Sequence, residues 1–264
     1  MTYSDELIAR LTAAAHAAAD AARPETLRHF RTDPDTDNKD GAGFDPVTEG
    51  DRAAERAMRA VLARLRPEDA ILGEEFGHTE GSSGLTWVLD PIDGTRAYIA
   101  GAPTWGVLVA VSDGDGPILG LIDQPHTTER FFGAPNGATL DGPGGHRRLA
   151  TRGPRPLSQA IVMTTFPEVG TPEEGTAFRR VSEAAKLTRY GLDCYAYGLL
   201  SLGLVDLVIE AGLQSYDIQG PMAVVQAAGG LVTDWTGGPA HQGGRVLAAA
   251  NPEIQAEAMR LLKG

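Results

Sequence analysis

Carboxylate side chains stand at the ends of short apolar runs of this chain. The run Trp87-Val88-Leu89 leads into Asp90-Pro91-Ile92-Asp93-Gly94-Thr95, which predicts a strand, a turn and the start of a helix. Two carboxylates three residues apart at such a turn can face one pocket and offer the oxygen ligands that Mg²⁺ prefers. Gly94 lets the backbone approach a ligand closely, and the helix N-terminus offers amides to a phosphate. A simple Asp cap and turn has the same pattern, so this stretch alone does not decide the chemistry.

Further acidic residues stand at other element ends. They are Glu74-Glu75 after an apolar run, Asp51 at a helix start that Thr48 can cap, and Glu210 and Asp217 around a glycine-containing loop. Each of them also fits a solvated loop or a carboxylate that complements a helix dipole. Together, their positions favour a shared acidic pocket over a set of unrelated caps.

Competing motifs fail at particular positions. Phosphatases with an aspartyl nucleophile need a second Asp two residues after the first, but Ile92 stands there after Asp90. Asp33, Asp35 and Asp37 hint at a calcium loop that lacks its glycine and its closing Glu. The chain also has no P-loop and no convincing Ser/His/Asp set.

The pattern of apolar residues predicts helices packed on a largely antiparallel sheet in the first half. Helices are expected from Ser4 to about Ala22 and over 49–65, and strands over 70–72, 87–90, 105–112, 117–123 and 129–133. The second half alternates, with strands expected over 160–164, 205–209 and 231–234 and helices over 172–185, 195–202, 218–228 and from Pro252. These patterns predict an α/β protein of packed layers.

The glycine- and proline-rich stretch 134–156 is the expected domain boundary. Residues 1–150 would form an α+β metal-binding lobe, and residues 151–264 an α/β lobe that completes the substrate site.

Composition limits the function classes. The 264 residues carry a formal net charge of -12, which argues against nucleic acid or an anionic membrane as partner. It also means that an anionic substrate needs cations at the site. Cys194 is the only cysteine, and the chain start lacks the apolar core of a signal peptide. We therefore expect a cytoplasmic protein without disulfides.

Taken together, these motifs resemble the inositol monophosphatase superfamily. The resemblance rests on Glu74-Glu75, on Asp90 to Thr95, and on Tyr216-Asp217 followed by Ala227-Ala228-Gly229-Gly230. It extends from about Lys39 to Asp234 and implies a layered αβαβα sandwich, Mg²⁺ dependence with two or three ions per site, and a homodimer.

The resemblance also implies roles for individual residues. The expected metal ligands are Glu74, Asp90, the carbonyl of Ile92, Asp93 and Asp217. Gly94 and Thr95 would bind phosphate through their amides. Thr95 and Asp51 would form a pair that, with Glu74, orients and deprotonates the attacking water. Lys39 matches a basic residue near the early loop of the family.

Within the superfamily, the chain looks most like histidinol-phosphate phosphatases. The similarity lies in Gly94 to Gly106, Ile122 to Pro125 and Tyr190 to Tyr197. Asp193 and Glu210, with Arg96, are the expected substrate-binding residues, and two acids would suit a cationic amine or imidazole.

Four alternatives stay open. Asp193 could merely cap the following helix, and Gln219 and Pro221, where relatives carry small apolar residues, could reshape the substrate rim or shift the helix start. The substrate could instead be inositol monophosphate, another sugar phosphate or a phosphoadenosine nucleotide. A non-catalytic metal-binding relative is the alternative of another class, although Glu74, Asp51 and Thr95 argue against it.

Overall fold

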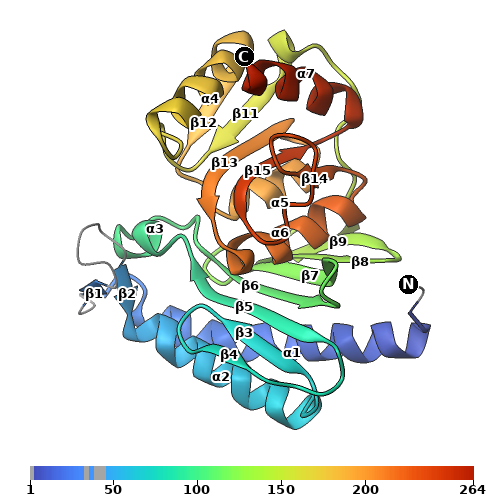
Figure 1. Ribbon diagram of the computed structural model, residues 1–264. Helices are drawn as coiled ribbons and strands as arrows, with labels where there is room; N and C mark the ends of the chain where they lie inside the picture. Colours follow the sequence, from blue (N-terminus) through green and yellow to red (C-terminus); the bar gives the residue numbers. More distant parts are fainter. Residues whose placement is uncertain (1–2, 33–35, 39–45) are drawn as a thin grey trace.

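Helices and sheets alternate in five layers in the computed structural model, which describes residues 3–32, 36–38 and 46–264 (Figure 1). One outer layer holds α1 and α2. It is followed, in this order, by an eight-stranded sheet, the central helices α5 and α6, a five-stranded sheet and the outer helices α4 and α7. The helices are α1 (Asp5–His29), α2 (Glu49–Leu65), α3 (Thr95–Ile99), α4 (Pro172–Ala184), α5 (Tyr195–Ser201), α6 (Ser215–Ala227) and α7 (Pro252–Lys263). The αβαβα fold expected from the resemblance is therefore confirmed.

The eight-stranded sheet has the order β10-β9-β8-β7-β6-β5-β3-β4. Its strands are β3 (Ala70–Gly73), β4 (Gly77–Thr79), β5 (Thr86–Asp93), β6 (Gly106–Ser112), β7 (Pro117–Gln124), β8 (Glu129–Ala134), β9 (Gly137–Gly142) and β10 (Gly145–Arg148). Among these strands only β3 and β5 run parallel, so the expected antiparallel character is confirmed. The short strands β1 (Thr36–Asn38) and β2 (Pro46–Thr48) pair with each other just before α2.

The five-stranded sheet has the order β12-β11-β13-β15-β14 and is mixed. Its strands are β11 (Ile161–Thr164), β12 (Leu187–Tyr190), β13 (Leu207–Leu213), β14 (Leu231–Thr233) and β15 (Gly244–Ala249). β11 pairs in parallel with β12 and β13, whereas β15 runs antiparallel to both of its neighbours. The alternating pattern of the second half predicted three of these strands and missed β12 and β15.

The strands in the middle of the large sheet are buried on both faces. On β6, Val107, Val109 and Val111 pack toward α1 and α2, while Leu108 packs toward α6. A strand covered by helices on both sides reads as a continuous apolar run, which is why Gly106–Ser112 shows no polar alternation. The large sheet is thus held rigidly between two helical layers, and its strand ends are fixed in position.

Helix α1 extends further than expected. Ser4 accepts a hydrogen bond from the Leu7 amide at 3.2 Å, which confirms it as the N-cap, but the helix passes through Pro24 and ends at His29. Pro24 removes one backbone hydrogen bond. The extra turn is secured by Thr26, which is fully buried and whose carbonyl accepts the Tyr98 hydroxyl at 2.6 Å. The proline therefore does not end the helix.

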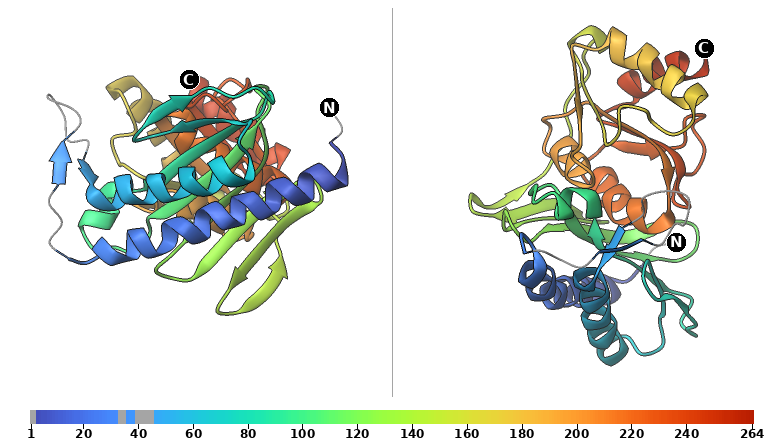
Figure 2. Two further views of the ribbon diagram at one scale, coloured as in Figure 1. Left: turned by 90° about the horizontal axis from the view of Figure 1, so that it is seen from below. Right: turned by 90° about the vertical axis from the view of Figure 1, so that its left-hand side faces the viewer.

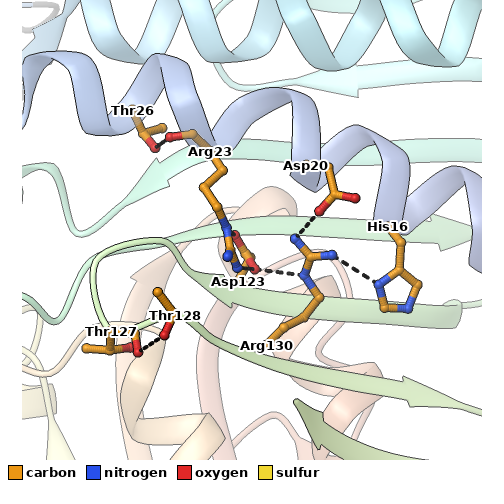
Figure 3. A network of polar contacts seen from close by, with 8 residues as sticks. All are labelled: His16, Asp20, Arg23, Thr26, Asp123, Thr127, Thr128 and Arg130. Carbon is orange, nitrogen blue, oxygen red and sulfur yellow. Dashed lines mark hydrogen bonds and ion pairs between the residues drawn. The ribbon is translucent and has the colours of Figure 1, made fainter. Parts of the chain in front are cut away.

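Buried ion pairs fasten α1 to the sheet beneath it. Asp123 on β7 is fully buried and accepts hydrogen bonds from Arg23 of α1 and from Arg130 of β8 (Figure 3). Arg130 also bonds Asp20 at 2.8 Å and contacts the ring of His16. These contacts fix α1 across the sheet next to α2, as the view from below shows (Figure 2).

The stretch 134–156 is not a simple linker, because β9 and β10 form within it. The strands of the two sheets do separate after Arg148, close to the expected boundary. However, α5 and α6 follow that boundary in sequence and pack against the large sheet, where their apolar side chains share one core with Leu108 and Phe131. The division into lobes at residues 150 and 151 remains a prediction.

Within the described residues, no helix combines the length and the apolar character needed to cross a membrane.

Candidate active site

Three carboxylates meet between the large sheet and the central helices. Asp90 and Asp93 lie on β5 and Asp217 lies in the first turn of α6, and each offers an oxygen within 4.8 Å of the others. Two elements more than 120 residues apart in sequence are therefore brought together at one point. This acidic cluster contains three of the expected metal ligands.

Asp217 is placed by the start of α6. The helix begins at Ser215 rather than at the expected Ile218, and the Asp217 carboxylate accepts the Gln214 amide at 2.6 Å. This capping bond satisfies one of the amides that a helix start leaves without a partner. It also directs the carboxylate toward the N-terminal end of α6, where β5 ends.

Asp93 is placed by the loop that leads into α5. Its carboxylate accepts the backbone amide of Cys194 at 2.7 Å. The next residue, Gly94, has φ +82°, and a Cβ atom there would lie 2.8 Å from the Asp193 carboxyl carbon. Only glycine fits this position, because both the backbone conformation and the close approach of Asp193 exclude a side chain.

Burial and mutual repulsion disfavour the ionised forms of the carboxyl groups in the acidic cluster. Burial, followed by the nearby Glu74, Asp93 and Asp217, holds the pKa of Asp90 well above its usual range. Burial and the nearby Asp193 and Asp217 do the same to the pKa of Asp93. A hard divalent cation fits this donor set, because it prefers carboxylate oxygens and offsets the repulsion between them.

Glu74 joins the cluster from the turn after β3. Its amide donates to the Leu89 carbonyl on β5 at 3.2 Å, and its carboxyl group lies close enough to Asp90 to raise the pKa of that residue. The parallel pairing of β3 with β5 ends at Gly73 and Leu89, which brings this turn beside Asp90. The structure thus places Glu74 beside Asp90, at the edge of the acidic cluster.

Asp51 and Thr95 occupy neighbouring element starts but make separate hydrogen bonds. Asp51 is buried in the first turn of α2 and accepts the Thr48 amide at 2.8 Å and the Thr48 hydroxyl at 2.6 Å. Burial raises its pKa to about 6. The Thr95 hydroxyl donates to the Ile92 carbonyl at 3.1 Å. In the described part of the chain no hydrogen bond joins Asp51 to Thr95, so their pairing stays a prediction.

A cavity of about 250 Å³ opens beside the cluster. Asp93, Gly94, Thr95 and Asp217 line it, and the other lining residues include Arg96, Thr165, Phe166, Asp193, Tyr197 and Glu210. All three residues expected to bind substrate therefore face the same cavity as the carboxylate cluster.

Glu210 is a buried carboxyl on β13. It accepts the Thr165 amide at 2.8 Å, the Thr165 hydroxyl at 2.9 Å and the Thr164 hydroxyl at 3.1 Å. Burial raises its pKa to about 7, even though these hydrogen bonds act in the opposite direction. Glu210 is therefore fixed in place and ready to ionise beside a cation.

Asp193 does more than cap a helix. It has φ +47°, an unusual backbone conformation for a residue with a side chain, and α5 begins two residues later with Cys194 as its N-cap. Burial raises its pKa to about 6, and its hydrogen bond with Thr104 and the charge of Arg96 act in the opposite direction. The carboxyl thus lies between Gly94 and the cavity, with Arg96 nearby.

Arg96 forms the rim of the cavity. Its guanidinium lies over the ring of Phe166 at 4.9 Å. Phe166 is 44% exposed, so one face of its ring is open to solvent or to a ligand. This pair places a cation and an aromatic face at the cavity mouth.

Tyr197, Thr164, Thr165 and Phe166 were not among the expected site residues. Tyr197 is buried on α5, and its hydroxyl has no hydrogen-bond partner among the described residues. The helical pattern could have placed Tyr197 one turn after Asp193. No comparable pattern pointed to Thr164 and Thr165, because they end an ordinary apolar strand.

Gln219 and Pro221 do not line the cavity, contrary to one of the alternatives left open by the sequence. Gln219 does not line the cavity, because it is 3% exposed inside α6 and donates to the His241 carbonyl at 3.1 Å. Pro221 also lies inside α6, well after its start, so neither residue forms the substrate rim. Lys39 lies outside the described residues.

Comparisons with known proteins place the chain among phosphatases. A family model described as "Inositol monophosphatase family" matches residues 7–263. The chain is 44% identical over 237 residues to the protein named bifunctional phosphatase IMPL2, chloroplastic, from Arabidopsis thaliana, covering 89% of this chain and 67% of that protein. It is 32% identical over 260 residues to a histidinol-phosphatase from Streptomyces coelicolor, covering 94% and 95% of the two chains. Among solved structures, an inositol monophosphatase from Zymomonas mobilis matches with a TM-score of 0.86 at 36% identity, covering 100% of both chains.

Proposed function

The chain belongs to the inositol monophosphatase family, and from that premise we propose that it hydrolyses histidinol phosphate to histidinol with the help of Mg²⁺. One observation carries the proposal. A single cavity is lined by Asp93 and Asp217 of the acidic cluster and also by the carboxyl groups of Asp193 and Glu210. The phosphate would bind beside the first pair, and the alcohol part of the substrate would contact the second pair.

The metal site consists of this chain's own oxygen donors. Asp90, Asp93, Asp217 and Glu74 would hold the cations, together with the carbonyl of Ile92. When bound, two or three Mg²⁺ ions would polarise the phosphoryl oxygens, favour deprotonation of water and stabilise the leaving alkoxide. The residues fit this role because their crowded charges need such a counter-charge.

The remaining residues would orient the reacting groups. The amides of Gly94 and Thr95 would bind the phosphate at the start of α3, and Glu74, Thr95 and Asp51 would orient the water and take its proton. The water oxygen then attacks phosphorus directly, the bond between phosphorus and the alcohol oxygen breaks, and the alcohol leaves with a proton. No residue forms a covalent intermediate.

The acidic side of the cavity favours a cationic alcohol. Histidinol carries an amino group that is protonated near neutral pH and an imidazole ring. Burial disfavours the ionised forms of Asp193 and Glu210, and a bound cation would restore them. A neutral polyol would leave both carboxyl groups without a charged partner.

Inositol 1-phosphate is the second candidate substrate. It is supported by the match, at 36% identity, to the inositol monophosphatase from Zymomonas mobilis. Other sugar or nucleotide phosphates would use the same metal site. A non-catalytic metal-binding relative would not need the water-orienting set of Glu74, Asp51 and Thr95, all of which the chain contains.

A substrate panel tests the proposal. Phosphate release would be measured from L-histidinol phosphate, myo-inositol 1-phosphate and 3′-phosphoadenosine 5′-phosphate, each with Mg²⁺ and with a chelator. We expect histidinol phosphate to have the highest kcat/KM, by at least about tenfold, and the chelator to stop turnover. Faster turnover of another ester would refute the substrate assignment, and Mg²⁺-independent turnover would refute the metal site.

Asp193→Asn tests whether the site recognises a cationic substrate. The change keeps the shape of the side chain and removes its charge. A charge-assisted hydrogen bond contributes about 1.5–3 kcal/mol, so kcat/KM for histidinol phosphate should fall by about tenfold or more. Turnover of inositol phosphate should change little. Equal losses for both esters would mean that Asp193 does not recognise the cation.

A further inference from the structure

Glu55 is a fully buried carboxylate on α2 that does not line the active-site cavity. One of its oxygens accepts the Glu75 amide at 2.7 Å, and the other lies 3.3 Å from the Phe76 amide. The second oxygen also accepts Arg59 Nε at 2.7 Å. A buried charge with this many partners is specifically held, since an unpaired carboxylate would be costly at this depth.

Arg59 extends the contact from α2 to the β3–β4 hairpin. Its guanidinium donates to the Gly77 carbonyl and, at 2.9 Å, to the Thr79 hydroxyl. The Glu55–Arg59 pair therefore binds the turn after β3 and the strand that returns from it. The ion pair lies within α2, and hydrogen bonds from both of its members join the helix to the hairpin.

The turn between β3 and β4 contains Glu74. At Gly73, on one side of it, a Cβ atom would lie 1.9 Å from a Glu55 oxygen, so the carboxylate packs directly against the backbone there. On the other side, Glu75 donates its amide to Glu55. The amide of Glu74 itself donates to the Leu89 carbonyl on β5. Both neighbours of Glu74 are thus held by Glu55, while its own backbone is held by the strand that leads into Asp90.

We propose that the Glu55–Arg59 pair is a positioning device for Glu74, which sets the distance between the Glu74 carboxylate and Asp90. This inference rests on the proposed function, because it assumes that Glu74 is a metal ligand. Asp51 stands one helical turn before Glu55 on α2, so the same rigid helix positions two of the groups assigned to water activation.

The chain offers a matched control for a purely structural role. Asp206 is also fully buried, accepts Arg152 at 2.9 Å and accepts the Ile161 amide at 2.8 Å. It does not line the active-site cavity. Glu55→Gln and Asp206→Asn therefore make the same chemical change to similar buried pairs, but only one of them contacts the Glu74 turn.

The test measures metal affinity directly. Binding of Mn²⁺, a spectroscopic substitute for Mg²⁺, would be followed by electron paramagnetic resonance on the wild type and both variants, together with their Tm. Partners that orient a metal ligand typically change metal affinity by about 10–100-fold, so we expect Glu55→Gln to raise the Kd for Mn²⁺ by at least about tenfold. Asp206→Asn should lower Tm to a similar extent and leave the Kd unchanged.

Activity gives a second readout. The Mg²⁺ concentration for half-maximal turnover should rise by a similar factor in Glu55→Gln, while KM at saturating Mg²⁺ stays close to the wild-type value. If Glu55→Gln does not fold, Arg59→Met keeps the carboxylate and should raise the Kd in the same direction by a smaller factor.

The possible failures can be told apart. If the wild type binds Mn²⁺ and Glu55→Gln binds it equally tightly, the positioning role is wrong and the proposed function stands. If the Kd for Mn²⁺ rises equally in Glu55→Gln and Asp206→Asn, the Glu55–Arg59 pair contributes only to general stability, and the proposal is also wrong. If the wild type binds no Mn²⁺, the metal site fails, and with it the positioning role.

Discussion

At the scale of single residues, the site is a set of groups placed where folding alone would not favour them. Asp90 is buried among acids that raise its pKa, and Asp193 has a backbone conformation that side chains disfavour. Such positions destabilise the fold and persist where the surrounding structure imposes them. The proximity of these two residues to Asp93 is a physical argument for function that does not depend on similarity to other proteins.

The raised pKa of Glu210 makes the stability of the protein depend on pH. Burial raises its pKa from 4.5 to about 7, so between these values the folded protein holds a proton that the unfolded chain has released. The contribution of protonated Glu210 to the free energy of unfolding is fully present below pH 4.5 and is lost as the pH rises through about 7. Each pKa unit corresponds to 1.36 kcal/mol, so the loss amounts to about 3 kcal/mol.

Glu210→Gln removes this titration. Urea unfolding in metal-free buffer, at about pH 5 and about pH 8, should show the wild type losing about 2.5 kcal/mol more stability than the variant over that interval. The same pH dependence in both proteins would show that Glu210 ionises normally in the folded state.

At the scale of elements, the turn from β5 into α3 connects the metal ligands to the phosphate site. Gly94 sits at this turn with φ +82° and in contact with Asp193. Asp93 lies just before it and Thr95 just after it. Gly94 therefore determines how closely Asp193 approaches the turn that carries Asp93 and Thr95.

Gly94→Ala should damage activity more than stability. Gly84 also has φ +82° but has open space around its Cβ position, so Gly84→Ala provides a control with the same backbone strain. Gly84→Ala should cost about 1–2 kcal/mol in unfolding experiments, and Gly94→Ala should cost at least as much because its methyl group also meets Asp193. Only Gly94→Ala should lower kcat/KM, by about tenfold or more, because it displaces Asp193. Equal kinetics for the two variants would contradict this account of the turn.

Local signals predicted the elements well where a cap and an apolar stripe agreed. Thr48 and the stripe that includes Met58 predicted α2, and its observed bounds Glu49–Leu65 confirm the range. The prediction for α1 stopped seven residues early, because a proline inside a helix can be tolerated when tertiary contacts secure the next turn. β9 and β10 were missed because their glycines resemble a linker until a neighbouring strand pairs with them.

At the scale of the whole molecule, the central helical layer assembles the site. Helix α6 presents Asp217 to β5 of the large sheet, and the loop before α5 presents Asp193 to Gly94. β13 of the smaller sheet contributes Glu210 to the same cavity. The cavity is therefore complete only when both sheets are packed against α5 and α6.

This arrangement explains what the sequence could and could not predict about the site. The spacing of Asp90 and Asp93 indicated a local pair, and the acids at other element ends favoured a shared pocket, but only the resemblance to a family made Asp217 an expected metal ligand. Glu55 was overlooked because it lies beside Ala54 on the buried face of α2, where a charged residue is an exception that a search for apolar patterns passes over. The homodimer and the cytoplasmic location remain predictions.

The most direct test of the account is Asp93→Asn, assayed for turnover and for stabilisation by Mg²⁺. Since burial and neighbouring acids already disfavour the ionised form of Asp93, the neutral Asn should leave the metal-free Tm unchanged or higher. Mg²⁺ at about 100 times its Kd should stabilise the wild type by about 3 kcal/mol. We predict that Asp93→Asn loses both this stabilisation and the hydrolysis of histidinol phosphate while remaining folded. Undiminished hydrolysis in the folded variant would contradict the proposed metal site.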